Sequence, residues 1–439
     1  MSNIAIGLIG IVVLVLLLFS RMPIGATMAF VGSVGFGSIV GMESMLGMLQ
    51  TVPFSTFASQ ALSVIPLFVL MGSLCFAAGM SEDLYYMVNA WLGRFRGGLA
   101  MATVGACALF AAISGSSLAT VATLGKVAWP EMVRYKYHPR LSTGAIAAGG
   151  CLGILIPPST VLIIYGVITE QSIGALFMAG FAPGILEAIF YIIVIIYLTW
   201  RNPELGPKGP SSTWGQKAKS LAKCWDVIII FLVVIGGIYT GKFTPTEAAG
   251  IGAFFALVFV GVRRKLTPKL YIGAVEDTIK TTGMLFIIVF GAMVFGYFLT
   301  VTRLPYQLSE FVFSLNVSRY VALAAVLIVI LLLGCIMDSL AIVLLAVPVL
   351  YPMIMKLGFD PIWFGIMTVR VTEMGLITPP VGLNVYIIQG LTGVPMSTCF
   401  RGIVPFLISD FVHIIVLILF PGIATFLPQI LDMHTPVGF

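Results

Sequence analysis

The chain has 439 residues, of which 59% are hydrophobic and only 9% are charged, with a formal net charge of +6. Soluble domains carry about 25% charged residues, and the mean hydropathy here is +1.10, so an ordinary soluble protein is excluded. Backbone polar groups find no water inside a bilayer, so membrane spans are helices or closed barrels. Long runs such as IGLIGIVVLVLLLFS lack the alternation of barrel strands. We therefore predict an all-α polytopic protein of the lipid bilayer, with no nucleic-acid partner.

The first half of the chain predicts spans and interrupted segments in a definite order. Continuous apolar spans of bilayer length are expected at 3–20, 23–41, 63–80 and 173–199. Between them, two short segments meet at a Gly/Ser break and are too short for two comfortable crossings, which favours a re-entrant hairpin over 99–130. Proline removes a backbone hydrogen bond and clashes with the preceding turn, so the span 142–169 is expected to unwind at Pro157-Pro158.

The second half repeats the first. A shift of 222 residues without a gap places six of the eight prolines between residues 1 and 183 on prolines, among them Pro157 on Pro379 and Pro158 on Pro380. At a background of roughly 5% proline, chance would give fewer than one such match. We therefore predict two repeats, 1–222 and 223–439. The second repeat contains a hairpin over 320–353 and a broken helix over 362–390.

Basic residues predict the orientation of the spans, because loops rich in Lys and Arg stay in the cytoplasm. The loop 200–224 and the segment 263–269 are the most basic, and the stretch 225–262 between them fits two spans. With a re-entrant hairpin, each repeat crosses the membrane five times. Five is odd, so the second repeat is expected to be inverted, with both termini outside. Paired interruptions in inverted repeats point to the binding site of a secondary transporter.

The interruptions have a chemistry of their own. A helix broken inside the membrane exposes N–H groups at one new end and carbonyls at the other, which attract anions and cations respectively. Small oxygen-bearing side chains surround the four predicted breaks, and hard oxygen ligands suit an alkali cation better than a transition metal. We therefore expect two symmetric sodium sites. The residues assigned to them are Ser114, Ser116, Ser117, Gly153, Pro157, Asp338, Ser339, Gly375, Thr378, Pro379 and Asn384.

An anionic substrate is expected between the hairpin tips. The candidate contacts are Ser159, Thr160, Arg370 and Gly382. Arg370 has two interpretations: it pairs with Glu373 on the same helix, or it faces a substrate carboxylate. Glu187, Asp410 and His413 also fall inside spans, where we expect hydrogen bonds between scaffold helices rather than proton coupling. The alternative for the breaks themselves is a set of helix kinks filled by Ser and Thr side chains.

No catalytic or energising motif accompanies these features. Gly125-Lys126 and Gly241-Lys242 are followed by Val and Phe, so neither completes a phosphate-binding loop. The six cysteines are scattered without a C-x-x-C spacing, as expected of small packing residues. A membrane enzyme would need clustered catalytic groups, and the sequence offers no convincing set. We predict a transporter driven by an ion gradient or by another chain, not an enzyme.

Several long strings resemble one known family. They include ALFAAISGSSLATVATLGKVAWPEM, AAGGCLGILIPPSTVLIIYGVITEQSIGALFMAGFAPG, MDSLAIVLLAVPVLYP and GLITPPVGLN. These strings, together with RMPIGA, IPLFVLMG and TPTEAAG, closely resemble the large membrane subunit of tripartite ATP-independent periplasmic (TRAP) transporters, the DctM type, over essentially the full chain. One departure is Ser73, where many members carry an acidic residue; it bears on local polar packing and not on the class.

The resemblance implies a sodium-driven importer of an organic acid in the bacterial inner membrane, with sodium ions as the coupling ions. It also implies two partners, a small four-helix membrane subunit of the DctQ type and a periplasmic substrate-binding protein of the DctP type. No four-helix block precedes Met1, so we expect the small subunit to be a separate chain. The alternative is a stand-alone ion-coupled organic-anion carrier of the same superfamily, which would need no binding protein.

The resemblance further implies an elevator-type fold of the ion-transporter superfamily. Carried onto this chain, the moving transport domain would cover about 85–184 and 305–406, and the remaining spans would form the scaffold. Segments 42–62 and 264–281 would supply arm helices in the plane of the membrane.

Overall fold

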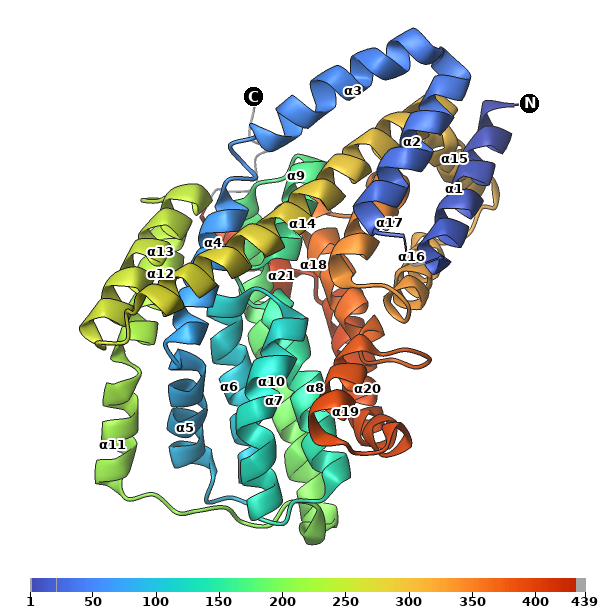
Figure 1. Cartoon of the computed structure of the whole chain (residues 1–439). Coiled ribbons are helices and arrows are strands. Elements are labelled where there is room, and N and C mark those ends of the chain that lie inside the picture. The colour runs from blue at the N-terminus through green and yellow to red at the C-terminus, as the bar shows by residue number, and fades with distance from the viewer. Residues whose placement is uncertain (1, 21, 432–439) are drawn as a thin grey trace.

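The computed structural model describes residues 2–20 and 22–431, which form twenty-one α-helices and no strand beyond an isolated bridge between Arg96 and Lys208 (Figure 1). The first half comprises α1 (Asn3–Phe19), α2 (Ile24–Val40), α3 (Met42–Phe57), α4 (Val64–Ala77), α5 (Met80–Leu92), α6 (Gly98–Ser114), α7 (Ser117–Arg134), α8 (Pro139–Leu155), α9 (Thr160–Thr169) and α10 (Ile173–Arg201). The second half comprises α11 (Trp214–Lys223), α12 (Trp225–Tyr239), α13 (Pro245–Val262), α14 (Pro268–Thr302), α15 (Leu304–Ser314), α16 (Arg319–Gly334), α17 (Ser339–Lys356), α18 (Pro361–Gly375), α19 (Leu383–Thr392), α20 (Met396–Leu419) and α21 (Gly422–Ile430). Among the described helices, five are long and apolar enough to cross a membrane, or up to eight if each bent pair is one span.

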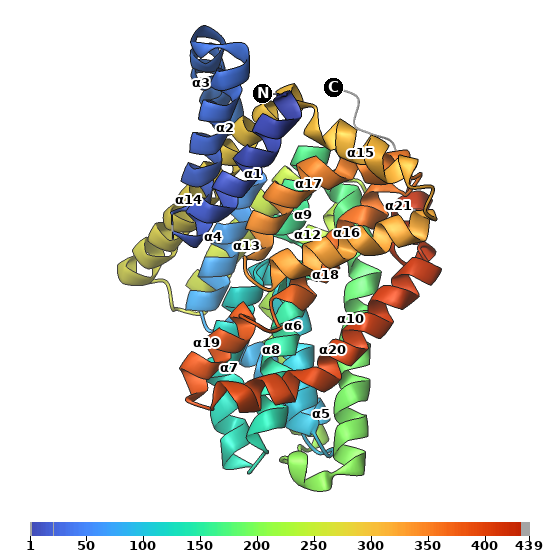
Figure 2. The same cartoon turned by 90° about the vertical axis from the view of Figure 1, so that its right-hand side faces the viewer.

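The predicted inverted repeat is confirmed. Helices α7 and α17 occupy equivalent ranges, and α8 and α18 both begin at the equivalent prolines Pro139 and Pro361. Both predicted Pro-Pro interruptions separate two helices, α8 from α9 and α18 from α19. Figure 2 shows α7 in the lower half of the molecule and α17 in the upper half, so the two hairpins enter from opposite ends.

The repeats differ at the predicted arms. In the first repeat, α3 is separate from α4 and projects at the upper edge of the molecule in Figure 1. In the second repeat, arm and span are one continuous helix, α14, of 35 residues. Pro66 lies in the first turn of α4, where its missing N–H is tolerated, whereas the equivalent Ile288 allows a helix to continue.

The last span of the second repeat, which the repeat predicts at 402–428, also differs from its first-repeat counterpart at 173–199. Helix α10 is continuous over 29 residues, but α20 ends at Leu419 and α21 begins at Gly422. Pro421 lies at this break, and proline disfavours the helical conformation of the residue before it. Helices α5, α11 and α15 were not predicted from the sequence; α5 and α15 connect the third span of each repeat to its hairpin.

The helices pack as two groups. We call α1–α4 and α12–α14 the frame helices, and α5–α10 with α15–α21 the site helices, because each group packs mainly within itself. A cluster of ion pairs joins them at the end of α13. Arg263 contacts Asp226 of α12 and Asp83 of α5, each at 2.5 Å, and Lys223 contacts Asp83 at 2.6 Å.

Candidate functional site

The tip of the first hairpin is a turn of two residues between α6 and α7. Helix α6 ends at Ser114, Gly115 adopts a positive φ of 58°, and Ser116 caps α7. Glycine is favoured here because the left-handed conformation strains other residues. A Cβ atom at Gly115 would also lie 3.0 Å from the carbonyl oxygen of Pro158. The hairpin tip therefore packs directly against the Pro-Pro break of its own repeat.

Oxygen atoms converge at this contact. The Ser116 carbonyl accepts hydrogen bonds from Ser114 Oγ at 3.2 Å and from Thr120 Oγ1 at 2.8 Å. Thr160, which begins α9, donates its hydroxyl to the Gly115 carbonyl at 3.1 Å. Gly153 passes so close that a Cβ there would lie 2.6 Å from Thr120 Oγ1 and 2.8 Å from the Ser116 carbonyl. The structure thus brings Ser114, Ser116, Gly153 and Thr160 together at the break that contains Pro157.

The second hairpin tip has a related arrangement. Helix α16 ends at Gly334 and α17 begins at Ser339, with Asp338 as its cap: the carboxylate accepts from the N–H of Leu340 at 3.2 Å. Gly334 and Gly375 meet so closely that a Cβ at Gly375 would lie 2.5 Å from the Gly334 Cα. The tip therefore rests against the end of α18, as the first tip rests against the end of α8.

The second Pro-Pro break is longer than the first. It runs from the end of α18 at Gly375 to the start of α19 at Leu383. Thr378 donates its hydroxyl back to the Met374 carbonyl at 2.6 Å, and Pro379 is exposed. Gly382 has a positive φ of 63°, and its neighbour is the ring of Phe400. Among these residues, Thr378 and the carbonyls freed by unwinding are the oxygen ligands that this break can offer.

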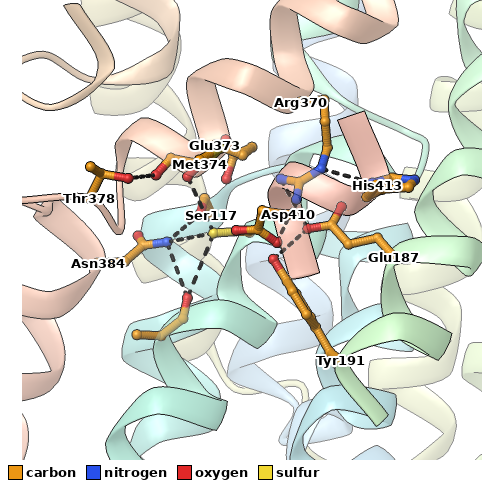
Figure 3. A network of polar contacts seen from close by, with 12 residues as sticks. Ser117, Glu187, Tyr191, Arg370, Glu373, Met374, Thr378, Asn384, Asp410 and His413 are labelled. Carbon is orange, nitrogen blue, oxygen red and sulfur yellow. Dashed lines mark hydrogen bonds and ion pairs between the residues drawn. The ribbon is translucent and has the colours of Figure 1, made fainter. Parts of the chain in front are cut away.

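Asn384 was assigned to a sodium site, but its side chain contacts the first hairpin and so connects the two repeats. Its side-chain amide donates to Ser117 Oγ at 2.9 Å, so a residue of the second break contacts the first hairpin (Figure 3). Ser339 of the second hairpin donates to Glu373 Oε1 at 2.9 Å. The carboxyl group of Glu373, which the sequence suggested only as a partner of Arg370, is therefore buried against the second hairpin.

Arg370 does not pair with Glu373, and this expectation was wrong. Its guanidinium contacts Glu187 at 3.2 Å and Asp410 at 2.6 Å, and its Nε donates to His413 Nδ1 at 2.9 Å (Figure 3). Glu373 instead accepts a hydrogen bond from Ser339 of the second hairpin. The Arg370 side chain is 0% exposed. This geometry favours an internal ion cluster that joins α18 to α10 and α20 over direct contact with a substrate.

A cavity of about 1000 Å³ lies between the two helix groups. Both hairpin tips reach it, through Ser114, Ser116 and Asp338, and Thr160 reaches it from the first Pro-Pro break. Frame helices α2, α4 and α14 form the opposite wall, where Ser73 of α4 donates to Asp277 of α14 at 2.9 Å. Of the four candidate substrate contacts, Thr160 lines this cavity, whereas Ser159, Arg370 and Gly382 are buried elsewhere.

A second cavity of about 370 Å³ also lies between frame and site helices. It is lined by α9, the second half of α14, and α17. Leu344 of α17 lines this smaller cavity, and its repeat equivalent, Ala122 of α7, lines the larger one. The α17 wall of the smaller cavity therefore corresponds to the α7 wall of the larger one, which has more than twice the volume.

Comparison with protein families decides the class. The model of the family described as "Tripartite ATP-independent periplasmic transporter, DctM component" matches residues 11–423. The chain belongs to this family. This large permease is 38% identical over 385 residues to the C4-dicarboxylate TRAP transporter large permease protein DctM of Pseudomonas aeruginosa, covering 87% of this chain and 89% of that protein. It is 32% identical to the sialic acid TRAP transporter large permease protein SiaM of Vibrio cholerae, covering 94% and 96%.

Solved structures support the fold of the permease. The YdaH transporter of Alcanivorax borkumensis matches with a TM-score of 0.62 at 16% identity, covering 90% of each chain. MtrF of Neisseria gonorrhoeae matches with a TM-score of 0.60 at 14% identity, covering 87% of this chain and 85% of that one. The relatives are named as transporter permeases and not as enzymes, in agreement with the prediction from the sequence.

Proposed function

We propose that this chain is the permease of a sodium-coupled TRAP transporter that imports an organic acid through the bacterial inner membrane. The observation that carries the proposal is the shared cavity, onto which both hairpin tips open. A substrate in this cavity would meet two helix N-termini, those of α7 and α17, which favour an anion.

Sodium is the proposed coupling ion because of the oxygen atoms gathered at each tip. At the first tip, the hydroxyls and carbonyls of Ser114, Ser116, Thr120 and Thr160 lie within hydrogen-bond distance of one another. At the second tip, Asp338 and Thr378 offer a carboxylate and a hydroxyl. Neutral oxygens with at most one carboxylate suit an alkali cation. Asn384 and Ser117 would act from between the two sites.

The two helix groups supply a means of alternating access. We propose that the site helices move as one body against the frame helices, which would close the larger cavity and open the smaller one. The Arg370 cluster ties α18 to α10 and α20, so the proposed moving body extends beyond the boundaries at 184 and 406 to the whole of these helices. Rigid-body movement of one helix bundle against another is a common form of alternating access.

Sodium coupling is testable on the full chain without knowledge of the cargo. The purified permease in detergent should unfold at a higher temperature as NaCl replaces choline chloride at constant ionic strength, because a ligand that binds only the folded state stabilises it. Replacing Asp338 with Ala should weaken this response. An unfolding temperature that is the same in both salts would contradict sodium binding.

Partners are testable by uptake. Proteoliposomes that contain the permease with a four-helix small subunit should take up a labelled organic acid when its periplasmic binding protein is present outside. Omitting either partner should abolish uptake, and a proton gradient alone should not replace the sodium gradient. Uptake by the permease alone would support the alternative of a stand-alone carrier.

A further inference from the structure

The larger cavity contains a basic side chain that the proposed sites do not use. Lys126 of α7 lines the cavity together with Ala119, Ala122 and Thr123 from the same helix. Among the described residues that line it, Lys126 is the one basic residue. Charged side chains inside a membrane are costly and are candidates for function by default.

Lys126 has no ionic partner among the residues that the structure describes, and its side chain is exposed to the cavity. The acidic residue of the frame that lines the same cavity, Asp277, accepts a hydrogen bond from Ser73. Other basic residues near the frame behave differently: Arg263 has carboxylate partners and Lys265 donates to the Ala78 carbonyl. Lys126 is therefore free to meet a negative charge that enters the cavity.

The position of Lys126 on α7 directs it toward the hairpin tip. Side chains on a helix lean toward its N-terminus, and the N-terminus of α7 is the tip at Ser116. Ala119 and Ala122 occupy the preceding turns on the cavity side, and their small side chains leave space there. The lysine lies nine residues after Ser117, about 13 Å along the helix axis.

We propose that Lys126 binds the carboxylate of the cargo, and that this cargo is an organic acid with a single carboxylate and a largely apolar body. This inference rests on the proposed transport function and specifies its substrate class. The apolar body would contact side chains such as Phe76, Phe110, Leu118 and Met284. A second carboxylate would find Asp277 and Asp338 on the walls, and like charges repel.

The basic residue proposed to bind the carboxylate has no counterpart in the second repeat. The residue equivalent to Lys126 is Pro348, which lines the smaller cavity and carries no charge. Lys126 is therefore an addition to the shared framework of the two repeats, in the way expected of a specificity residue.

The proposal can be tested with three probes of equal carbon number: hexanoate, adipate and the neutral hexanamide. The reporter is a cysteine in place of Ala122 in the full-length protein in nanodiscs, and its rate of alkylation is measured; the six native cysteines are buried.

Hexanoate should protect this cysteine at lower concentration than adipate or hexanamide. In Lys126→Met, the hexanoate concentration for half protection should rise at least about ten-fold, as for a lost hydrogen bond to a charged group. Hexanamide protection should not change, and Lys126→Arg should stay close to the parent.

Three results would overturn the proposal. They are equal hexanoate protection in Lys126→Met and the parent, stronger protection by adipate than by hexanoate, and no protection of the parent by any probe. A lysine that only extends to lipid headgroups would give the first result. The sodium response of thermal unfolding, measured on the same samples, reports separately on the proposed function. Its absence in the parent would contradict sodium coupling, while the probe comparison would still decide the role of Lys126.

Discussion

Cys151 and Glu373 are equivalent positions of the two repeats, and they touch each other. The thiol of Cys151 donates to the backbone carbonyl of Glu373 at 3.4 Å, across a sequence separation of 222 residues. Equivalent residues can meet only where the two repeats face each other across their shared axis. Helices α8 and α18 therefore cross at this contact, between the two hairpin tips.

A larger side chain at Cys151 should force the repeats apart. Cys151 is fully buried, and overpacking a close-packed core costs about 1–3 kcal/mol. Cys151→Phe is expected to lower the unfolding temperature and to weaken its response to NaCl, because both tips rest on these helices. Cys151→Ser, which keeps the size and the donor, is the control. A phenylalanine variant with the stability and sodium response of the parent would show that the crossing tolerates separation.

The Arg370 cluster should tolerate removal of all its charges better than removal of one. Arg370→Met leaves Glu187 and Asp410 buried without a cation, and breaking such a pair costs about 3–5 kcal/mol. Adding Glu187→Gln and Asp410→Asn should restore much of the loss of thermal stability. Adding Glu373→Met should restore none.

The control for this series is Lys280→Met, which breaks an exposed pair with Glu276 at 3.9 Å and should change stability little. Rescue of Arg370→Met by Glu373→Met would show that these two residues are the functional pair after all.

Asp338 should contribute to sodium binding beyond its role as a helix cap. Asp338→Ala removes both the cap and the carboxylate, whereas Asp338→Asn keeps an acceptor for the Leu340 N–H. Both variants should raise the NaCl concentration needed for half of the thermal stabilisation, by about ten-fold if about 1.4 kcal/mol of binding is lost. Ser318→Ala removes the cap of α16 outside the site and is the matched control. An equal shift in this control would assign the effect to capping alone.

Gly153 should be intolerant of a methyl group for a reason specific to the tip. A Cβ at Gly153 would lie 2.6 Å from Thr120 Oγ1 and 2.8 Å from the Ser116 carbonyl, and the latter is backbone that cannot rotate away. Gly153→Ala is expected to abolish the sodium response. Gly273→Ala, in a helix with nothing within 4 Å of the new atom, should stabilise by about 0.5–1 kcal/mol. A normal sodium response in Gly153→Ala would remove the first tip from the ion sites.

The orientation of the two repeats is open to labelling. A cysteine at Ser211 should react with an impermeant maleimide only from the cytoplasm, and one at Gln307 only from the periplasm, because basic loops stay inside. Both side chains are exposed. Reaction of both from one side would rule out the predicted placement of these loops.

The sequence predicted those features whose cause is local. Pro157-Pro158 and Gly115 interrupt helices through restrictions on their own backbone, so the hairpins and interruptions could be predicted from the chain. The partners of Arg370 could not, because Glu187, Asp410 and His413 are brought to it by the packing of separate helices. A spacing of three residues suggested a pair with Glu373, but neighbouring helices on the two sides of α18 offered each side chain a better partner.

The lining of the larger cavity was likewise only partly predictable. The residues that the hairpins contribute were expected, because the helix breaks can be located in the sequence, but the residues that the frame helices contribute were not. Which residues of α2, α4 and α14 face the tips depends on how two groups of helices meet, and no short motif records this. Lys126 was noted in the sequence only as part of an incomplete phosphate-binding motif, and only its place in the cavity gives it a role.

The continuous helix α14 limits how closely the two repeats can follow the same symmetry. Its 35 residues make a strut about 52 Å long, whereas the same stretch in the first repeat is divided into α3 and α4 by a joint at 58–63. A continuous helix moves as one rigid element, whereas two helices joined by a short connection can change the angle between them. In the movement proposed above, the two end positions would therefore not be equivalent, because the second repeat has one continuous helix where the first repeat has two joined helices.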